Sequence, residues 1–196
     1  MKLFTEKLTS RPLVALVLAA VALAVAPLFI KNDFYLDGFI LVFVWAAFAG
    51  SWNIISGYCG MVSLGHNAFF GIGAYTSTLL LLRYGLTPWL GMLVGGGLAA
   101  LVGLVLGIVC FRLRSHYFAL ATLAFGQVSF IVAINWRSLT GGAEGIALPI
   151  EPGLYNMASS SKLAYLYIGL ALFLCVMLIF HVIERSRLGY YLTAFK

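Results

Sequence analysis

A short polar segment inside a long uncharged stretch carries the side chains of this sequence that are best suited to chemistry. Ser63, His66 and Asn67 lie within five positions of one another, among several glycines. Their hydroxyl, imidazole and carboxamide groups donate and accept hydrogen bonds, so they could line the path of a polar solute. They could equally bond to the backbone of an interrupted helix and stabilise its shape. The residues leave both interpretations open, and both can be true.

The stretch around this segment indicates where it must lie. From Gly38 to Leu82 the sequence runs for 45 residues without one Asp, Glu, Lys or Arg. A helix that crosses a bilayer needs about 20 apolar residues, so this length corresponds to two crossings. Lipid cannot satisfy exposed backbone and polar side chains. We therefore expect a broken polar segment between or within the second and third membrane helices, buried in protein or facing a water-filled path.

The composition places the whole chain in the membrane class. It is 63% hydrophobic and 9% charged, with a mean hydropathy of +1.04, which is far from the composition of soluble domains. Its net charge of +6 could suggest nucleic acid, but the basic residues stand at the ends of apolar runs rather than in a patch. We predict membrane lipid as a partner and no nucleic acid.

Cutting the chain at its charges predicts an all-α, polytopic integral membrane protein with about six transmembrane helices. The expected crossings are residues 12–30, 38–55, 62–82, 89–111, 115–136 and 163–183. No linker or soluble region separates them, so residues 1–196 are interpreted as a single membrane domain.

The charges between the crossings predict an orientation, because cytoplasmic loops carry an excess of Lys and Arg. With both termini cytoplasmic, the inner side holds Lys2, Lys7, Arg11, Arg112, Arg114, Arg185, Arg187 and Lys196. The outer side then holds Lys31, Arg83, Arg137 and Lys162. We therefore expect a multi-pass protein with its N-terminus and its C-terminus in the cytoplasm.

The predicted crossings contain no Asp, Glu, Lys or Arg, the side chains that ion-coupled carriers and intramembrane hydrolases commonly place at membrane depth. The histidines and the three cysteines are far apart and show no metal-ligand spacing. We therefore expect no catalytic residue, no metal and no cofactor, and a protein that is not an enzyme. Gln127 is a further uncharged polar residue that could line a path or bridge two helices.

A stripe of small residues marks the expected fourth helix at intervals of four. It consists of Gly91, Gly95, Ala99, Gly103 and Gly107, which share one helix face. Such faces let membrane helices approach closely. The stripe could pack against another helix of the same chain or form a subunit interface. The expected fifth helix, with Ala119 and Gly126 among its small residues, is a natural partner.

Four sequence motifs resemble one known family. They run from Gly57 to Tyr75, from Phe111 to Gly126, from Asn135 to Gly145 and from Ser186 to Phe195. Together they are similar to LivM-type permeases, the membrane subunits of branched-chain amino acid ABC importers. Met61 departs from the family, which typically has Gln there.

The resemblance implies a permease subunit that moves branched-chain or other neutral amino acids across the bacterial inner membrane. The implied partners are cytoplasmic ATPase subunits, a homologous LivH-type permease and a periplasmic amino acid-binding protein. The resemblance also makes Arg185, Arg187 and Gly189 the start of an ATPase-coupling segment. Without it, the same residues read as a basic tail held by anionic lipid.

Such permeases continue past the equivalent of Lys196, so we expect the C-terminal part of the family's domain to be missing from this chain. Two other functions stay open at this point, the first suggested by the glycine-rich polar segment and the stripe of small residues, the second by the missing part. One is a self-contained channel for a small neutral solute. The other is a non-transporting assembly subunit.

Overall fold

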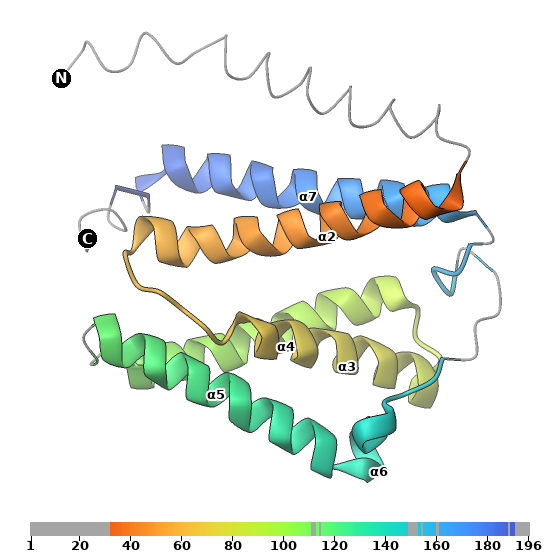
Figure 1. Ribbon diagram of the computed structural model, residues 1–196, viewed down its shortest axis with the longest axis horizontal. Helices are drawn as coiled ribbons and strands as arrows, with labels where there is room; N and C mark the ends of the chain where they lie inside the picture. The colour runs from red at the N-terminus through yellow and green to blue at the C-terminus, as the bar shows by residue number, and fades with distance from the viewer. Residues whose placement is uncertain are drawn as a thin grey trace, which may run out of the picture. The chain divides into compact units, whose positions relative to one another are not determined.

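The computed structural model describes residues 32–110, 113, 115–148, 153, 155–159, 161–187 and 189–190. The expected crossing 12–30 lies outside them, as do seven of the twelve basic residues used for the orientation: Lys2, Lys7, Arg11, Lys31, Arg112, Arg114 and Lys196. These described residues are almost entirely helical, with a single isolated bridge between Gly153 and Ala158. In chain order the elements are α2 (Asp33–Asn53), η2 (Ile54–Tyr58), α3 (His66–Tyr84), α4 (Pro88–Cys110), α5 (Ser115–Asn135), α6 (Arg137–Thr140), η3 (Gly142–Glu144) and α7 (Lys162–Arg185) (Figure 1).

Four stretches within the described residues are long and apolar enough to cross a membrane: Asp33–Tyr58, Pro88–Cys110, His116–Asn135 and Lys162–Glu184. The protein is therefore an all-α, multi-pass membrane protein, as the composition predicted. The expected crossing 62–82 corresponds to α3, which is not among the four. Its first turn carries His66 and Asn67 and its last turn carries Arg83, so its mean hydropathy is lower.

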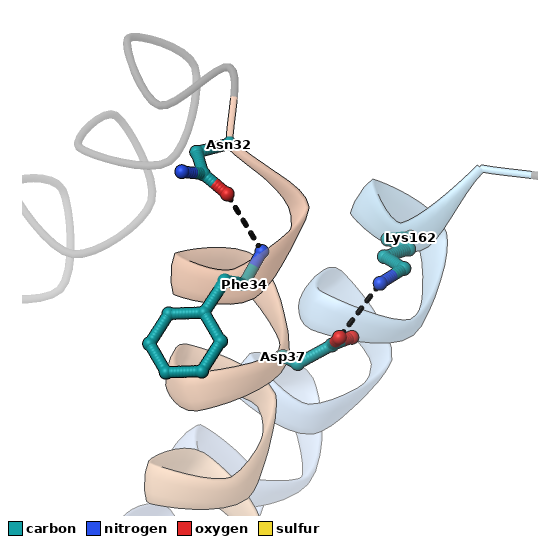
Figure 2. A network of polar contacts seen from close by, with 4 residues as sticks. All are labelled: Asn32, Phe34, Asp37 and Lys162. Atoms are coloured by element: carbon teal, nitrogen blue, oxygen red, sulfur yellow. Dashed lines mark hydrogen bonds and ion pairs between the residues drawn. The ribbon is translucent and has the colours of Figure 1, made fainter.

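The start of α2 differs from the prediction, which placed it at Gly38. The helix begins at Asp33, because the Asn32 side chain accepts a hydrogen bond from the Phe34 amide at 3.0 Å and caps the first turn (Figure 2). One turn later, Asp37 pairs with Lys162 at 2.6 Å between nitrogen and oxygen. A capped helix end and a nearby cation thus keep two acidic residues helical.

The described residues form two compact units, and the first contains α2 up to Ser51 together with α7. Its core is a cluster of Leu36, Phe43, Leu166 and Leu170, in which Leu166 is fully buried. A Cβ on Gly169 would meet the Phe43 Cβ at 3.5 Å, so the two helices approach closely at that glycine. Apolar packing and the Asp37–Lys162 pair thus join α2 and α7, which run parallel, because Asp37 meets Lys162, Phe43 meets Gly169 and Gly50 meets Val176.

The second unit, which contains α3, α4 and α5, is built around a tight helical hairpin. Gly85 ends α3 in the left-handed conformation with φ 62°, and its amide donates to the Leu81 carbonyl at 3.0 Å. The Thr87 hydroxyl then accepts from the Leu90 amide at 3.4 Å, with Pro88 at the first position of α4. This turn sends α4 back along α3.

The polar loop after α5 folds into a compact turn rather than an extended connection. The Thr140 hydroxyl oxygen lies 2.5 Å from the Ala133 carbonyl oxygen and 2.8 Å from that of Trp136, so its single proton is shared between them. The same hydroxyl accepts from the Gly142 amide at 3.2 Å. Gly141, Gly142 and Gly145 have φ of 75°, 66° and 72°, which favour glycine. The loop is attached to the α3–α4 turn, because Arg83 donates to the Ser138 carbonyl at 3.5 Å. The Tyr155 hydroxyl also donates to this turn, to the Gly85 carbonyl at 3.1 Å.

Candidate functional site

The predicted polar interruption is confirmed as a non-helical segment, residues 59–65, which we call the break. It follows η2, a π-helical turn that widens the end of α2, and leads directly into α3 at His66 (Figure 1). Gly60 adopts φ 65°, which favours glycine and marks where the helical path is abandoned. Because the helical bonding pattern stops here, the backbone groups of the break need other partners.

Side chains from neighbouring elements supply those partners. The Trp52 indole donates from Nε1 to the Ser63 carbonyl at 2.7 Å. The Ser63 amide donates to the Ser56 hydroxyl at 3.4 Å, and the Leu64 amide donates to the Thr122 hydroxyl on α5 at 3.0 Å. The break is therefore fixed at its centre by α2 from one side of the sequence and by α5 from the other.

Glycines allow the break and α5 to touch backbone to backbone. A Cβ on Gly65 would lie 2.5 Å from the Thr122 carbonyl oxygen, a distance that no real side chain tolerates. One turn along α5, a Cβ on Gly126 would lie 3.1 Å from Asn67 Oδ1 and 3.5 Å from the Gly65 Cα. Gly65, Thr122 and Gly126 are all buried. The contact depends on the absence of side chains at both glycines.

The position of Thr122 along α5 places the contact inside the membrane-spanning part of that helix. Thr122 is seven residues beyond Ser115, and at a rise of about 1.5 Å per residue this is roughly 10 Å along the axis. The break thus meets a spanning helix well away from its end. Irregular backbone at such a depth occurs where it is buried in protein or lines a cavity.

The structure brings three of the four predicted path residues together. Ser63 is buried, and its hydroxyl oxygen lies 3.3 Å from Nδ1 of the half-buried His66. Asn67 is exposed, lies against Gly126 and accepts a hydrogen bond from the Ala68 amide at 3.0 Å. The fourth residue, Gln127, is exposed on α5 immediately after Gly126. It stands next to the contact without a hydrogen bond to the break.

An aromatic row continues from His66 away from the break. The His66 ring stacks edge-on against Phe69, with centroids 6.1 Å apart, and Phe69 lies 5.7 Å from the Phe125 ring on α5. Phe69 also packs against α4, because a Cβ added to Gly103 would lie 3.5 Å from the Phe69 ring. The imidazole is thus oriented by Ser63 on one side and by an apolar cluster on the other.

Two residues that fix the break, Trp52 and Thr122, were not among the predicted site residues. Both lie in apolar runs, where a tryptophan and a threonine are common packing residues. Thr122 is separated from its partner Leu64 by 58 positions, so no local pattern connects them. The sequence indicated only that such partners must exist, because the backbone groups of the break require donors and acceptors from other helices.

The stripe of small residues on α4 faces α3, not α5 as the sequence suggested. A Cβ on Gly91 would lie 2.5 Å from the Ser77 hydroxyl, and one on Gly95 would lie 2.6 Å from the Gly73 carbonyl oxygen. The paired small residues Gly73 and Ser77 of α3 are themselves four apart. The short turn at Gly85 makes α3 the nearest neighbour, which decides the pairing. Ala99 and Gly107, the remaining members, are half-buried on the same helix.

Comparison with known proteins decides what kind of protein carries this arrangement. The family described as "Branched-chain amino acid transport system / permease component" matches residues 34–196. The chain belongs to this family. The match covers the break, α3 to α7 and the residues that follow α7. A transport component, rather than an enzyme, is the class to which the family assigns the chain.

Two curated relatives of this permease carry matching names. The high-affinity branched-chain amino acid transport system permease protein LivM of Escherichia coli strain K12 is 35% identical over 142 residues, which is 72% of this chain and 33% of that protein. The protein of the same name from Salmonella typhimurium strain LT2 is 33% identical over 143 residues, 73% of this chain and 34% of its own length. This chain therefore spans about a third of the length of its curated relatives. No solved structure matches it.

The predicted ATPase-coupling residues lie at and after the end of α7. Arg185 is the last residue of that helix, Arg187 is exposed and Gly189 is buried. The Gly189 amide donates to the Ser186 hydroxyl at 3.4 Å, which turns the permease backbone directly after the helix. Residues 188 and 191–196 of the predicted segment lie outside the described residues.

The part of the permease that the structure describes contains no group of three His, Cys, Asp or Glu residues that could hold a metal ion. Cys59, Cys110 and Cys175 are unpaired thiols. The polar groups gathered at the break are hydroxyl, amide, imidazole and indole groups. Such a set can bind a neutral or zwitterionic solute by hydrogen bonds.

Proposed function

We propose that this chain is a membrane-spanning permease subunit of an ABC importer for branched-chain or other neutral amino acids. The observation that carries the proposal is the family match over residues 34–196, which includes the whole break. The names of the two relatives support the substrate class. The proposed energy source is ATP hydrolysis by separate cytoplasmic subunits.

The proposed translocation path passes the break, with Ser63, His66, Asn67 and Gln127 along it. The contact between Gly65 and Thr122 supports this, because it places irregular polar backbone against α5, a helix long and apolar enough to span the membrane. An amino acid with an apolar side chain needs a few hydrogen-bonding groups for its charged ends and apolar surface for the rest. The His66, Phe69 and Phe125 rings offer that combination beside Asn67.

The proposed setting is the bacterial inner membrane, with both termini in the cytoplasm. The α3–α4 turn and the Thr140–Gly145 loop lie at one end of the second unit, as an outer face requires, and the outer loop would face a periplasmic binding protein. Arg185, Arg187 and Gly189 would begin the ATPase-coupling segment at the opposite side. A homologous LivH-type permease would complete the membrane part.

The test is uptake of radiolabelled leucine into proteoliposomes that contain the full-length gene product, its permease partner, the ATPase subunits and the binding protein. We expect accumulation that depends on ATP and on the binding protein, and co-purification of the ATPase subunits. Passage of solute through vesicles that contain the chain alone, without ATP, would favour the channel instead. Failure of any ATPase to co-purify in mild detergent would favour an assembly subunit.

Path residues are tested by matched substitutions in the same assay. His66→Ala and Asn67→Ala should each reduce uptake, because both groups stand at the break. The controls are His116→Ala and Asn135→Ala, which remove the same side chains from the two ends of α5, where both are exposed. Equal effects of the site and control substitutions would contradict the proposed path.

A further inference from the structure

The break has an unusual dependence on two side chains from other helices. The Ser63 carbonyl is paired with the Trp52 indole at 2.7 Å, and the Leu64 amide is paired with the Thr122 hydroxyl at 3.0 Å. The Ser63 carbonyl accepts one bond and the Leu64 amide donates the other, and these two groups belong to the same peptide unit. Together they determine the position of the peptide that joins Ser63 to Leu64.

Thr122 is built for this role in a way that an ordinary helical threonine is not. Its hydroxyl donates to the Ala119 carbonyl of its own helix at 3.0 Å, which directs a lone pair at the Leu64 amide. The side chain is 8% exposed, so water does not replace the bond easily. By contrast, the Thr76 hydroxyl on α3 makes the bond to its own helix, to the Ile72 carbonyl at 2.7 Å, with no bond to the break.

The fixed peptide directly determines where the path residues stand. Ser63 places its hydroxyl 3.3 Å from His66 Nδ1, and Gly65 rests on the Thr122 carbonyl with no room for a Cβ. Asn67 lies against Gly126 on the same face of α5. A shift of the break relative to α5 would therefore move Ser63, His66 and Asn67 together.

We propose that Thr122 and Trp52 are positioning residues of the transport path, which clamp the Ser63–Leu64 peptide and thereby set the orientation of His66 and Asn67. This inference rests on the proposed function for its effect on transport. Its structural part, the clamping of the break, stands independently. The two parts are measured separately.

The structural part is tested by hydrogen exchange of the full-length permease in nanodiscs, read on peptides that cover residues 60–67. Thr122→Val keeps the shape of the side chain but leaves the Leu64 amide without its acceptor, so exchange there should rise by about tenfold. Thr122→Ser should restore the wild-type rate, and Thr76→Val is the matched control. Should Thr122→Val fail to reach the membrane, Trp52→Phe tests the same peptide. Unchanged exchange in both Thr122→Val and Trp52→Phe would overturn the clamp.

The transport part is tested with the same variants by leucine uptake. We expect Thr122→Val to lower kcat/KM by about tenfold while Thr122→Ser and Thr76→Val stay close to wild type. Faster exchange with unaltered kcat/KM would overturn the positioning role. If the wild-type protein itself shows no ATP-driven uptake, the proposed function fails, while the exchange result still decides the clamp.

Discussion

At the scale of single residues, glycines determine how closely the helices of this permease approach. Gly95 and Gly96 are adjacent in the sequence of α4, but only Gly95 packs against another helix. Gly95 is buried against the Gly73 backbone, whereas a Cβ on Gly96 would meet nothing within 4 Å. Sequence spacing alone cannot separate them, because small residues occupy several faces of this helix. The structure separates them, because only Gly95 contacts α3.

This pair yields a prediction for stability. Gly95→Leu forces atoms into the Gly73 carbonyl, and such overpacking typically costs about 1–3 kcal/mol. Gly96→Leu fills open space and gains helix propensity, so it should be neutral or stabilising. The measurement is the melting midpoint in detergent, followed by fluorescence-detected gel filtration. Equal midpoints for the two variants would mean that α3 and α4 are not in backbone contact.

The buried hydroxyl of Thr140 gives a second prediction. Thr140→Val removes the acceptor of the Gly142 amide and leaves that buried donor unpaired, which costs about 1–3 kcal/mol. We expect faster proteolysis of the loop at residues 137–148, with α5 intact. Thr140→Ser retains the hydroxyl and is the control. A protease pattern shared by both variants would show that the loop does not depend on this bond.

At the scale of elements, the helices were predictable where local chemistry ends them. Arg83 and Pro88 marked the turn before α4, whose expected range 89–111 differs from Pro88–Cys110 by one residue at each end. The start of α2 was not predicted, because Asp33 and Asp37 read as loop charges. Their helical state depends on the Asn32 cap and on Lys162, a partner 125 positions away.

The candidate site was predictable only in part, for a similar reason. The existence of the break followed from Ser63, His66 and Asn67 in an uncharged stretch. Its attachment to α5 did not follow, because Thr122 is an unremarkable residue of an apolar run. The exposed apolar surface of membrane helices gives them little amphipathic pattern, so hydrophobicity does not indicate which faces meet.

The pairing of α2 with α7 leads to a third prediction. Leu166 is fully buried in the cluster with Phe43, whereas Leu172 on the same helix is 40% exposed. Leu166→Ala should destabilise the permease by roughly 2 kcal/mol or more, since it opens a cavity in the contact. Leu172→Ala should cost clearly less. Thermal unfolding in the same detergent compares the two, and equal losses would place the contact elsewhere on α7.

At the scale of the whole molecule, the break and the loop Arg137–Gly145 lie toward different ends of the second unit. The loop Arg137–Gly145 follows the C-terminal end of α5, and the break contacts its N-terminal half. In the proposed importer, the loop would then lie at a membrane surface and the break at membrane depth. The proposed orientation assigns the loop to the periplasm.

That orientation is open to a direct labelling experiment. In a background where Cys59, Cys110 and Cys175 are replaced by Ser, single cysteines are introduced as Glu144→Cys and Arg187→Cys, both at exposed positions. A membrane-impermeant maleimide applied to spheroplasts should label the Glu144 variant at once and the Arg187 variant only after permeabilisation. Because the positive-inside bias rests on eight basic residues against four, the reverse pattern would contradict it and would move the proposed ATPase-coupling segment to the wrong side of the membrane.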